Sequence, residues 1–259
     1  MNIRPLHQTV RPSPVFLAIV ALAVAGGVLA WLAADTVQPL AYAGVFVFVI
    51  AGFLVSLCLH EFAHAYTAWR FGDHDVEARG YLTLNPLKYS HPLLSLGLPA
   101  LFIALGGIGL PGGAVYLRTS WMTKRQKTLV SLAGPATNLA FAVVLLVLTG
   151  LLREPDHAVF WAGMAFQAFL QLTAFLLNIL PVPGLDGYSA LEPHLSPQTQ
   201  RAIEPAKQWG FLILLLLVFT PVVNRWFFGL VDWFFGLSGI STALWQIGSQ
   251  LTRFWSVWF

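Results

Sequence analysis

Charged residues are scarce in this chain of 259 residues. They make up 10% of it, against about 25% of an ordinary soluble domain, while 57% of the residues are hydrophobic. The mean hydropathy is +0.72. These values exclude a disordered protein, a nucleic-acid-binding protein and an ordinary soluble enzyme. Cysteine is nearly absent, and Cys58 alone cannot form an internal disulfide. We therefore expect an integral membrane protein, of a length that suits one compact domain.

Apolar runs predict about six transmembrane helices, because about 20 apolar residues cross a bilayer. The first run, residues 14–34, follows Arg4 and Arg11 as the core of a signal peptide would. It is longer than the usual core of such a peptide, and no A-x-A cleavage site follows it, so we predict that it is retained as a span. The further predicted spans are residues 40–59, 129–152, 158–180, 209–223 and 226–237.

Glycine and proline interrupt the apolar stretch 92–113, between the second and third spans. At this density they break helices, and non-helical backbone survives at membrane depth only where protein or water surrounds it. We predict a re-entrant loop or short β-hairpin, with residues 80–85 and 114–118 as strands. The alternative is a kinked transmembrane helix. The predicted fold class is an all-α membrane protein that contains this one loop or hairpin.

The C-terminal region, residues 209–259, is rich in tryptophan. Pro221 and Asn224–Arg225 separate its two short runs, which form either two spans or one broken hairpin. Beyond them, apolar side chains at helical spacing lie opposite Gln246 and Gln250, which is typical of an amphipathic helix in the headgroup layer. A partner-binding face is the alternative. The apolar residues are Leu244, Ile247, Leu251, Trp255 and Trp258.

Positive side chains predict the orientation, because cytoplasmic loops carry an excess of lysine and arginine. With six spans and a cytoplasmic N-terminus, only Arg153 and Arg225 fall on the opposite side. Both chain ends, and the inner ends of the second and fourth spans, then lie at the cytoplasmic face. The positive residues on that side are Arg4, Arg11, Arg70, Arg79, Lys88, Arg118, Lys124, Arg125, Lys127, Arg201, Lys207 and Arg253.

The sequence His60-Glu61-Phe62-Ala63-His64 continues the second span and matches an H-E-x-x-H motif. An α-helix advances about 100° per residue, so the two histidines lie one turn apart on one face and can bind one metal ion. Glu61 lies beside that face, where a carboxylate can take a proton from water. Each ionisable side chain costs about 2.5–3.5 kcal/mol inside a membrane helix, which favours a zinc site. In the alternative, the histidines hydrogen-bond to neighbouring helices around a protonated Glu61.

A third protein ligand is needed, and Asp186 is the best candidate. It follows the fourth span, where Pro181, Pro183 and Gly184 break the helix and free the backbone to present the carboxylate to the second span. Read alone, this sequence of prolines, glycines and an aspartate predicts only a turn. In the predicted topology, however, it lies at the same membrane depth as the histidine pair. Weaker candidates are the other histidines, which fall on the opposite side or in polar loops, namely His157, His74, His91 and His194.

Three motifs, taken together and in this order, resemble the site-2 protease family of intramembrane zinc metalloproteases. They are HEFAH at 60–64, AGPATN at 133–138 and NILPVPGLDG at 178–187. Residues 71–92 are also similar to the loop that follows the first motif in prokaryotic members. The resemblance covers about residues 45–190.

The resemblance implies the chemistry of the site. The histidine pair and Asp186 would hold one Zn²⁺ per chain, and Glu61 would be the catalytic base. Asn178 would bind the substrate backbone or its oxyanion, and Asn138 would bind substrate or orient the re-entrant region. The implied reaction is hydrolysis of peptide bonds in or near transmembrane segments of membrane-bound substrates. We expect an exposed strand edge to pair with the unwound substrate.

The resemblance also implies how the protein is organised. We expect one integral membrane protease domain, residues 1–259, with a catalytic core at about 40–190 and with extra spans and an interfacial helix in 209–259. No PDZ-like insertion or C-terminal CBS-like domain is expected. The expected surroundings are a prokaryotic plasma membrane, with the N-terminus and the active site on the cytoplasmic side. The expected partners are the lipid bilayer and a membrane-protein substrate, with no nucleic acid.

Overall fold

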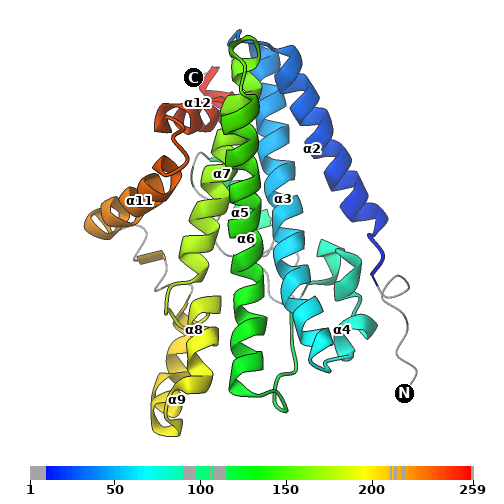
Figure 1. The fold of residues 1–259 in the computed structure, drawn as a ribbon, viewed down its shortest axis with the longest axis vertical. Coiled ribbons are helices and arrows are strands. Elements are labelled where there is room, and N and C mark those ends of the chain that lie inside the picture. Colours follow the sequence, from blue (N-terminus) through cyan, green and yellow to red (C-terminus); the bar gives the residue numbers. More distant parts are fainter. Residues whose placement is uncertain are drawn as a thin grey trace.

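The computed structural model describes residues 10–89, 97–105, 107, 115–210, 212, 215–216 and 220–257. Within these residues the fold is helical, as predicted, and contains no β-strand. Four antiparallel helices form its body (Figure 1). Each is long and apolar enough to cross a membrane, and they are α2 (Pro14–Leu32), α3 (Pro39–Arg70), α6 (Lys124–Leu152) and α7 (Ala158–Asn178), the last extended by a 3₁₀ turn, η4 (Pro155–His157). The first four predicted spans are therefore found as helices.

The long helices begin where the sequence favours a start. Pro14 and Pro39 stand in the first turn of α2 and α3, where a missing N–H group leaves no hydrogen bond unmade. Thr123 and Gln126 form a capping box at the start of α6, in which each side chain accepts a backbone N–H of the other residue. Because these starts satisfy the first N–H groups, each helix can begin at the edge of its apolar run.

α7 lies at the centre of the body. Nearly all of its side chains are buried, against α3, α6 and α12 (Thr242–Thr252). α2 lies at the edge and packs mainly against α3 (Figure 1). Glycine permits this packing: a Cβ atom at Gly26 would lie 2.8 Å from Phe48 Cα, and one at Gly44 would lie 2.9 Å from the Leu29 carbonyl carbon. The apolar core therefore runs through α3, α6 and α7, with α2 on one side.

The segment between α3 and α6 differs from the predicted hairpin. Residues 80–85 contain a 3₁₀ turn, η1 (Tyr81–Thr83), so the strand predicted there is wrong. Gly80 and Leu84, with φ of 77° and 56°, turn the chain on either side of it. Of the second predicted strand, Ala114 lies outside the described residues, and 115–118 forms neither a helix nor a strand. Most of 92–113 also lies outside them, and the described part holds a short helix, α5 (Leu98–Ala104).

The C-terminal region differs from the two predicted spans. The predicted span 209–223 is described only in part, because residues 211, 213–214 and 217–219 lie outside the described residues. The predicted span 226–237 falls within α11 (Pro221–Gly236), which has 16 residues and continues through Asn224–Arg225. The break predicted at that pair is therefore wrong, and the helix instead begins at Pro221, a residue favoured in a first turn. Six spans are not confirmed.

The predicted amphipathic helix is present as α12, and it packs on protein. Trp245 stacks on Phe169 of α7 with ring centroids 3.8 Å apart, and Leu251 is buried. Ile247, which belongs to the predicted apolar face, is exposed, because α12 turns a neighbouring face towards α7. Trp258 lies outside the described residues. A contact of α12 with the membrane surface stays a prediction.

The two ends of the described chain lie at opposite ends of the body. α2 starts at the end where α3 finishes, whereas α12 lies at the end where α3 starts (Figure 1). Phe254, after α12, contacts Phe46 in the second turn of α3 at a ring distance of 4.8 Å. Arg253 therefore lies at the end of the body opposite to the start of α2, and the prediction that both chain ends face the cytoplasm is not confirmed.

Short helices connect these parts. Between α3 and α6 lie α4 (Asp75–Ala78) and η2 (Pro86–Lys88), besides η1 and α5. The elements beyond α7 are α8 (Asp186–Leu191), η5 (Glu192–His194), α9 (Pro197–Ile203), η6 (Glu204–Trp209) and, after α12, η7 (Phe254–Val257).

Candidate metal centre

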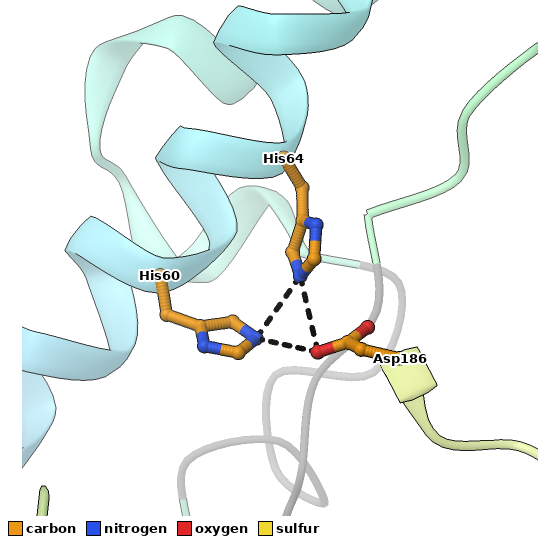
Figure 2. A group of neighbouring side chains, drawn as sticks. All are labelled: His60, His64 and Asp186. Carbon is orange, nitrogen blue, oxygen red and sulfur yellow. Dashed lines mark hydrogen bonds and ion pairs between the residues drawn. The ribbon is translucent and has the colours of Figure 1, made fainter. Parts of the chain in front are cut away.

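His60, His64 and Asp186 converge at one point (Figure 2). The two histidines project from α3, one turn apart, and Asp186 is the first residue of α8. Asp186 Oδ2 lies 3.2 Å from His60 Nε2 and 3.3 Å from His64 Nε2, and the two Nε2 atoms are 3.1 Å apart. Both histidines are buried, and the aspartate side chain is 23% exposed. The three residues predicted as ligands therefore lie together, although Asp186 is distant from the others in sequence.

The spacing of these three atoms fits a zinc ion. Nitrogen and oxygen ligands lie about 2.0–2.1 Å from zinc, and at tetrahedral angles they are then about 3.3 Å apart. The three observed separations fall between 3.1 and 3.3 Å. Three protein ligands leave one tetrahedral position open, which is the arrangement of catalytic rather than structural zinc sites.

The second nitrogen of each histidine ring fixes the ring orientation. His60 Nδ1 lies 2.6 Å from Asn138 Oδ1, and His64 Nδ1 lies 2.7 Å from the backbone oxygen of Val130. Both partners are acceptors, so each Nδ1 carries the hydrogen and each Nε2 keeps its lone pair for a metal. Such outer partners set the tautomer and raise the basicity of a metal-bound histidine. The hydrogen bonding therefore prepares both rings as ligands.

Gly134 on α6 faces the two histidines, and sequence reasoning did not single it out. A Cβ atom there would lie 2.6 Å from His60 Nε2 and closer still to His64 Nε2. Only glycine leaves this space free for the ligand atoms. Pro135 follows inside the helix and has no N–H group for the carbonyl of residue 131, one position after the Val130 carbonyl that binds His64. A Gly-Pro pair inside an apolar span is the signal that could have indicated this close contact.

The connection from α7 to α8 presents Asp186 to α3. Gly184 has a φ of 96°, a conformation that favours glycine. Gly187 lies against the backbone oxygen of Ile179, where any side chain would clash. The turn therefore places a carboxylate oxygen of Asp186 against the Nε2 atoms of both imidazoles, where one metal ion could bind all three groups.

Glu61 stands beside the ligand triad and does not join it. Its side chain is 3% exposed, and its Oε2 accepts the Val115 N–H at 3.2 Å. Val115 begins a segment without helix or strand, 115–119, in which partly buried and exposed residues alternate. Asp73 accepts the Arg118 N–H at 2.7 Å and ties this segment to the end of α3. Glu61 is therefore a buried carboxylate, next in sequence to the ligand His60 and held by a neighbouring segment.

The two predicted substrate-binding asparagines have different positions. Asn178 is the last residue of α7, buried, in the connection that leads to Asp186. Asn138 is 3% exposed, with its oxygen at His60 and its Nδ2 donating to Gln171 Oε1 at 2.8 Å. Since both ends of the Asn138 amide are engaged inside the protein, the structure favours a role in orienting His60 over contact with substrate.

Among the described residues, none of the alternative histidine ligands joins the triad. His157 stacks on Trp31 at the opposite end of the body, with ring centroids 3.5 Å apart. His194 Nε2 lies 2.9 Å from Thr128 Oγ1, and His74 precedes α4. His91 lies outside the described residues. Cys58 is free and buried.

Comparison with known proteins finds close relatives along the whole chain. A protein of Mycolicibacterium smegmatis that carries the name zinc metalloprotease Rip2 is 70% identical over 100% of both chains. The Rip2 protein of Mycobacterium tuberculosis is 68% identical over 98% of both chains. YwhC of Bacillus subtilis, also named as a zinc metalloprotease, is 34% identical over 68% of this chain and 81% of its own.

No family model matches the chain, and no solved structure matches it. The relatives and the triad agree on zinc as the metal. With full-length identity at this level and these three motifs in order, the chain belongs to the site-2 protease family of zinc metalloproteases.

Proposed function

We propose that this protein is an intramembrane metalloendopeptidase, which hydrolyses peptide bonds in or near transmembrane segments of membrane-bound substrates. One observation carries the proposal: an open three-ligand zinc site lies on a helix that is apolar enough to cross a membrane, with a buried glutamate beside it. A soluble substrate would not need a site inside such a helix. The proposed location is a prokaryotic plasma membrane, with the site on the cytoplasmic side.

Four residues of the chain have separate roles in the proposed hydrolysis. When bound, zinc supplies Lewis acidity, which polarises a carbonyl group and acidifies water. Glu61 takes a proton from the attacking water and returns it to the leaving amine. Asn178 donates a hydrogen bond to the carbonyl oxygen as it gains charge, a contact worth about 2.7–4 kcal/mol in other enzymes. Asn138 and the Val130 carbonyl keep the imidazoles oriented throughout.

The segment 115–119 is the proposed site for the unwound substrate. A helical substrate protects its amides, so the cleaved stretch has to leave the helix and pair with other backbone. Residues 115–119 are not in a helix, partly buried and exposed residues alternate along them, and Val115 anchors them at Glu61, so a substrate paired there would lie next to the proposed base. Residues 80–85, which were also predicted to form a strand edge, contain a turn, so we do not propose that they pair with the substrate.

Substitution of Glu61 by glutamine tests the reaction. Loss of a positioned base lowers turnover by about 10²–10⁴-fold, while zinc content stays normal because Glu61 is not a ligand. The variant is purified from native membranes, its zinc is measured, and the molecules that co-purify with it are identified. We expect the co-purifying molecule to be a membrane protein with a transmembrane segment. The wild-type protein should cleave it in vesicles, and the chelator phenanthroline should prevent this cleavage.

Glu77→Gln, on α4 at the same end of the molecule, is the matched control and should behave as wild type. A captured lipid or small amide would instead indicate a different membrane hydrolase. Normal turnover of the Glu61→Gln variant would show that the assigned base is wrong.

A further inference from the structure

A chain of three buried side chains leads away from the zinc site into the centre of α7. His60 Nδ1 contacts Asn138 Oδ1 at 2.6 Å, and Asn138 Nδ2 donates to Gln171 Oε1 at 2.8 Å. His60 is 6% exposed, Asn138 is 3% exposed and Gln171 is 0% exposed. Gln171 lies among apolar neighbours in a helix of the core, and its Nε2 has no hydrogen-bond partner among the described residues, so this side chain is costly there unless the bond made by its Oε1 is useful.

The donor and acceptor order along these hydrogen bonds decides whether His60 can bind zinc. A neutral imidazole carries its hydrogen on one nitrogen, and the ligand atom must be the other. An asparagine presents either an acceptor or a donor to Nδ1, depending on which way its amide points. Only the orientation with Oδ1 at His60 puts the hydrogen on Nδ1 and frees Nε2. With the amide reversed, the hydrogen would lie on Nε2 and obstruct the metal.

Gln171 holds the amide in the required orientation. Its Oε1 accepts the Asn138 N–H, and that contact leaves Oδ1 facing His60. We propose that Gln171 is a positioning residue of the zinc site, which selects the metal-binding tautomer of His60 by fixing the direction of the Asn138 amide. This inference rests on the zinc site and needs no assumption about the substrate.

The second histidine shows why His60 needs such a residue. His64 Nδ1 faces the backbone oxygen of Val130, which has no donor to present in its place. Its tautomer is therefore set by the fold of α6 alone. His60 depends on a side-chain amide that can rotate, so a further contact is required to set its direction.

Gln171→Met tests the proposal, because methionine has a similar volume and no comparable acceptor. Outer partners of metal-bound histidines change metal affinity by about 10–100-fold, and we expect a loss of about tenfold here. Zinc affinity is measured on the full-length protein in detergent by competition with a coloured chelator. Thermal unfolding of the zinc-free protein is followed in parallel, so the result does not depend on proteolysis.

Gln167→Met is the matched control. Gln167 lies one turn away in α7 and is 1% exposed, and neither end of its amide has a hydrogen-bond partner among the described residues. Its substitution should leave zinc affinity unchanged. Equal losses in the two variants would mean that α7 packing is the cause and would overturn the proposal, as would normal zinc affinity in Gln171→Met.

Asn138→Asp makes the test more specific. Either oxygen of a carboxylate can accept the hydrogen on His60 Nδ1, so the orientation of this side chain no longer matters. In that background Gln171→Met should have no further effect on zinc affinity. A second tenfold loss there would overturn the proposal. Where the methionine variant does not accumulate, Gln171→Glu keeps the accepting oxygen and should bind zinc as tightly as wild type; a tenfold loss in this variant would equally count against the proposal.

Discussion

At its C-terminal end, α3 contacts its neighbours through His60 and His64, which hydrogen-bond to α6 and lie against Gly134. At its N-terminal end, Val45 and Val49 pack in a continuous apolar cluster with α7 and α12. Hydrogen bonds and ligand distances require fixed positions, whereas apolar contacts gain free energy from area and tolerate small shifts. Substitutions at the site end should therefore change zinc binding first, and those at the other end should change stability first.

The largest expected effect is that of Asp186→Ala, which removes one of the three ligands. The purified variant should contain no zinc and show no proteolysis, while the helical content of the protein is retained because the apolar cluster is untouched. Metal analysis and circular dichroism measure the two properties. Asp156→Ala, an exposed carboxylate at the opposite end, should keep zinc. Loss of helical content in Asp186→Ala would contradict the proposal that the site end of α3 controls zinc binding and the other end controls stability.

Gly134→Ala should reduce zinc affinity about a hundredfold, as severe disturbance of the groups around a metal does. The added methyl meets the outer atoms of both imidazoles, which can move in the zinc-free protein only by weakening their hydrogen bonds to Asn138 and Val130, and cannot move while they bind zinc. The zinc-free protein should therefore lose about 1–2 kcal/mol of stability, less than the loss of zinc binding. The control is Gly150→Ala in the same helix, where nothing lies within 4 Å, and it should raise stability by about 0.5–1 kcal/mol. Chelator competition and thermal unfolding give the two readouts.

Gly248→Ala in α12 should show the opposite pattern. A Cβ atom there meets the backbone oxygen of Ala162 and lies 2.7 Å from Phe166 Cβ, neither of which is free to move. Overpacking of this kind costs about 1–3 kcal/mol, with zinc affinity unchanged. Gly236→Ala, at the end of α11 with nothing within 4 Å, serves as the control in thermal unfolding. A change in zinc affinity in Gly248→Ala would show that the two ends are coupled.

Local patterns predicted the long helices and the ligands. An apolar run with proline or a cap before it specifies a helix through its own side chains, so α2, α3, α6 and α7 could be located. The H-E-x-x-H spacing places two ligands on one helix face without reference to the rest of the fold. Asp186 could be added because a proline-rich break at the end of a span is also a local signal.

Features that depend on contacts between distant segments could not be predicted in this way. Residues 80–85 have the composition of a strand, yet Gly80 and Leu84 take left-handed conformations that turn the chain. Ile247 belongs to an apolar stripe, but the face of α12 that is buried depends on where Gly248 lets it approach α7. The contact between Asn138 and His60 arises because α6 passes beside α3, which neither sequence segment specifies alone.

The ligand triad joins α3 to the start of α8, two segments that the chain connects only through a long path. A bound ion is therefore a removable cross-link, and ion binding favours the folded site in proportion to the logarithm of free metal concentration over the dissociation constant. Zinc starvation should then do more than inactivate the enzyme: it would loosen the start of α8 against α3, while the contacts of Thr128 on α6 with Ala190 and His194 would still hold the rest of α8 in place.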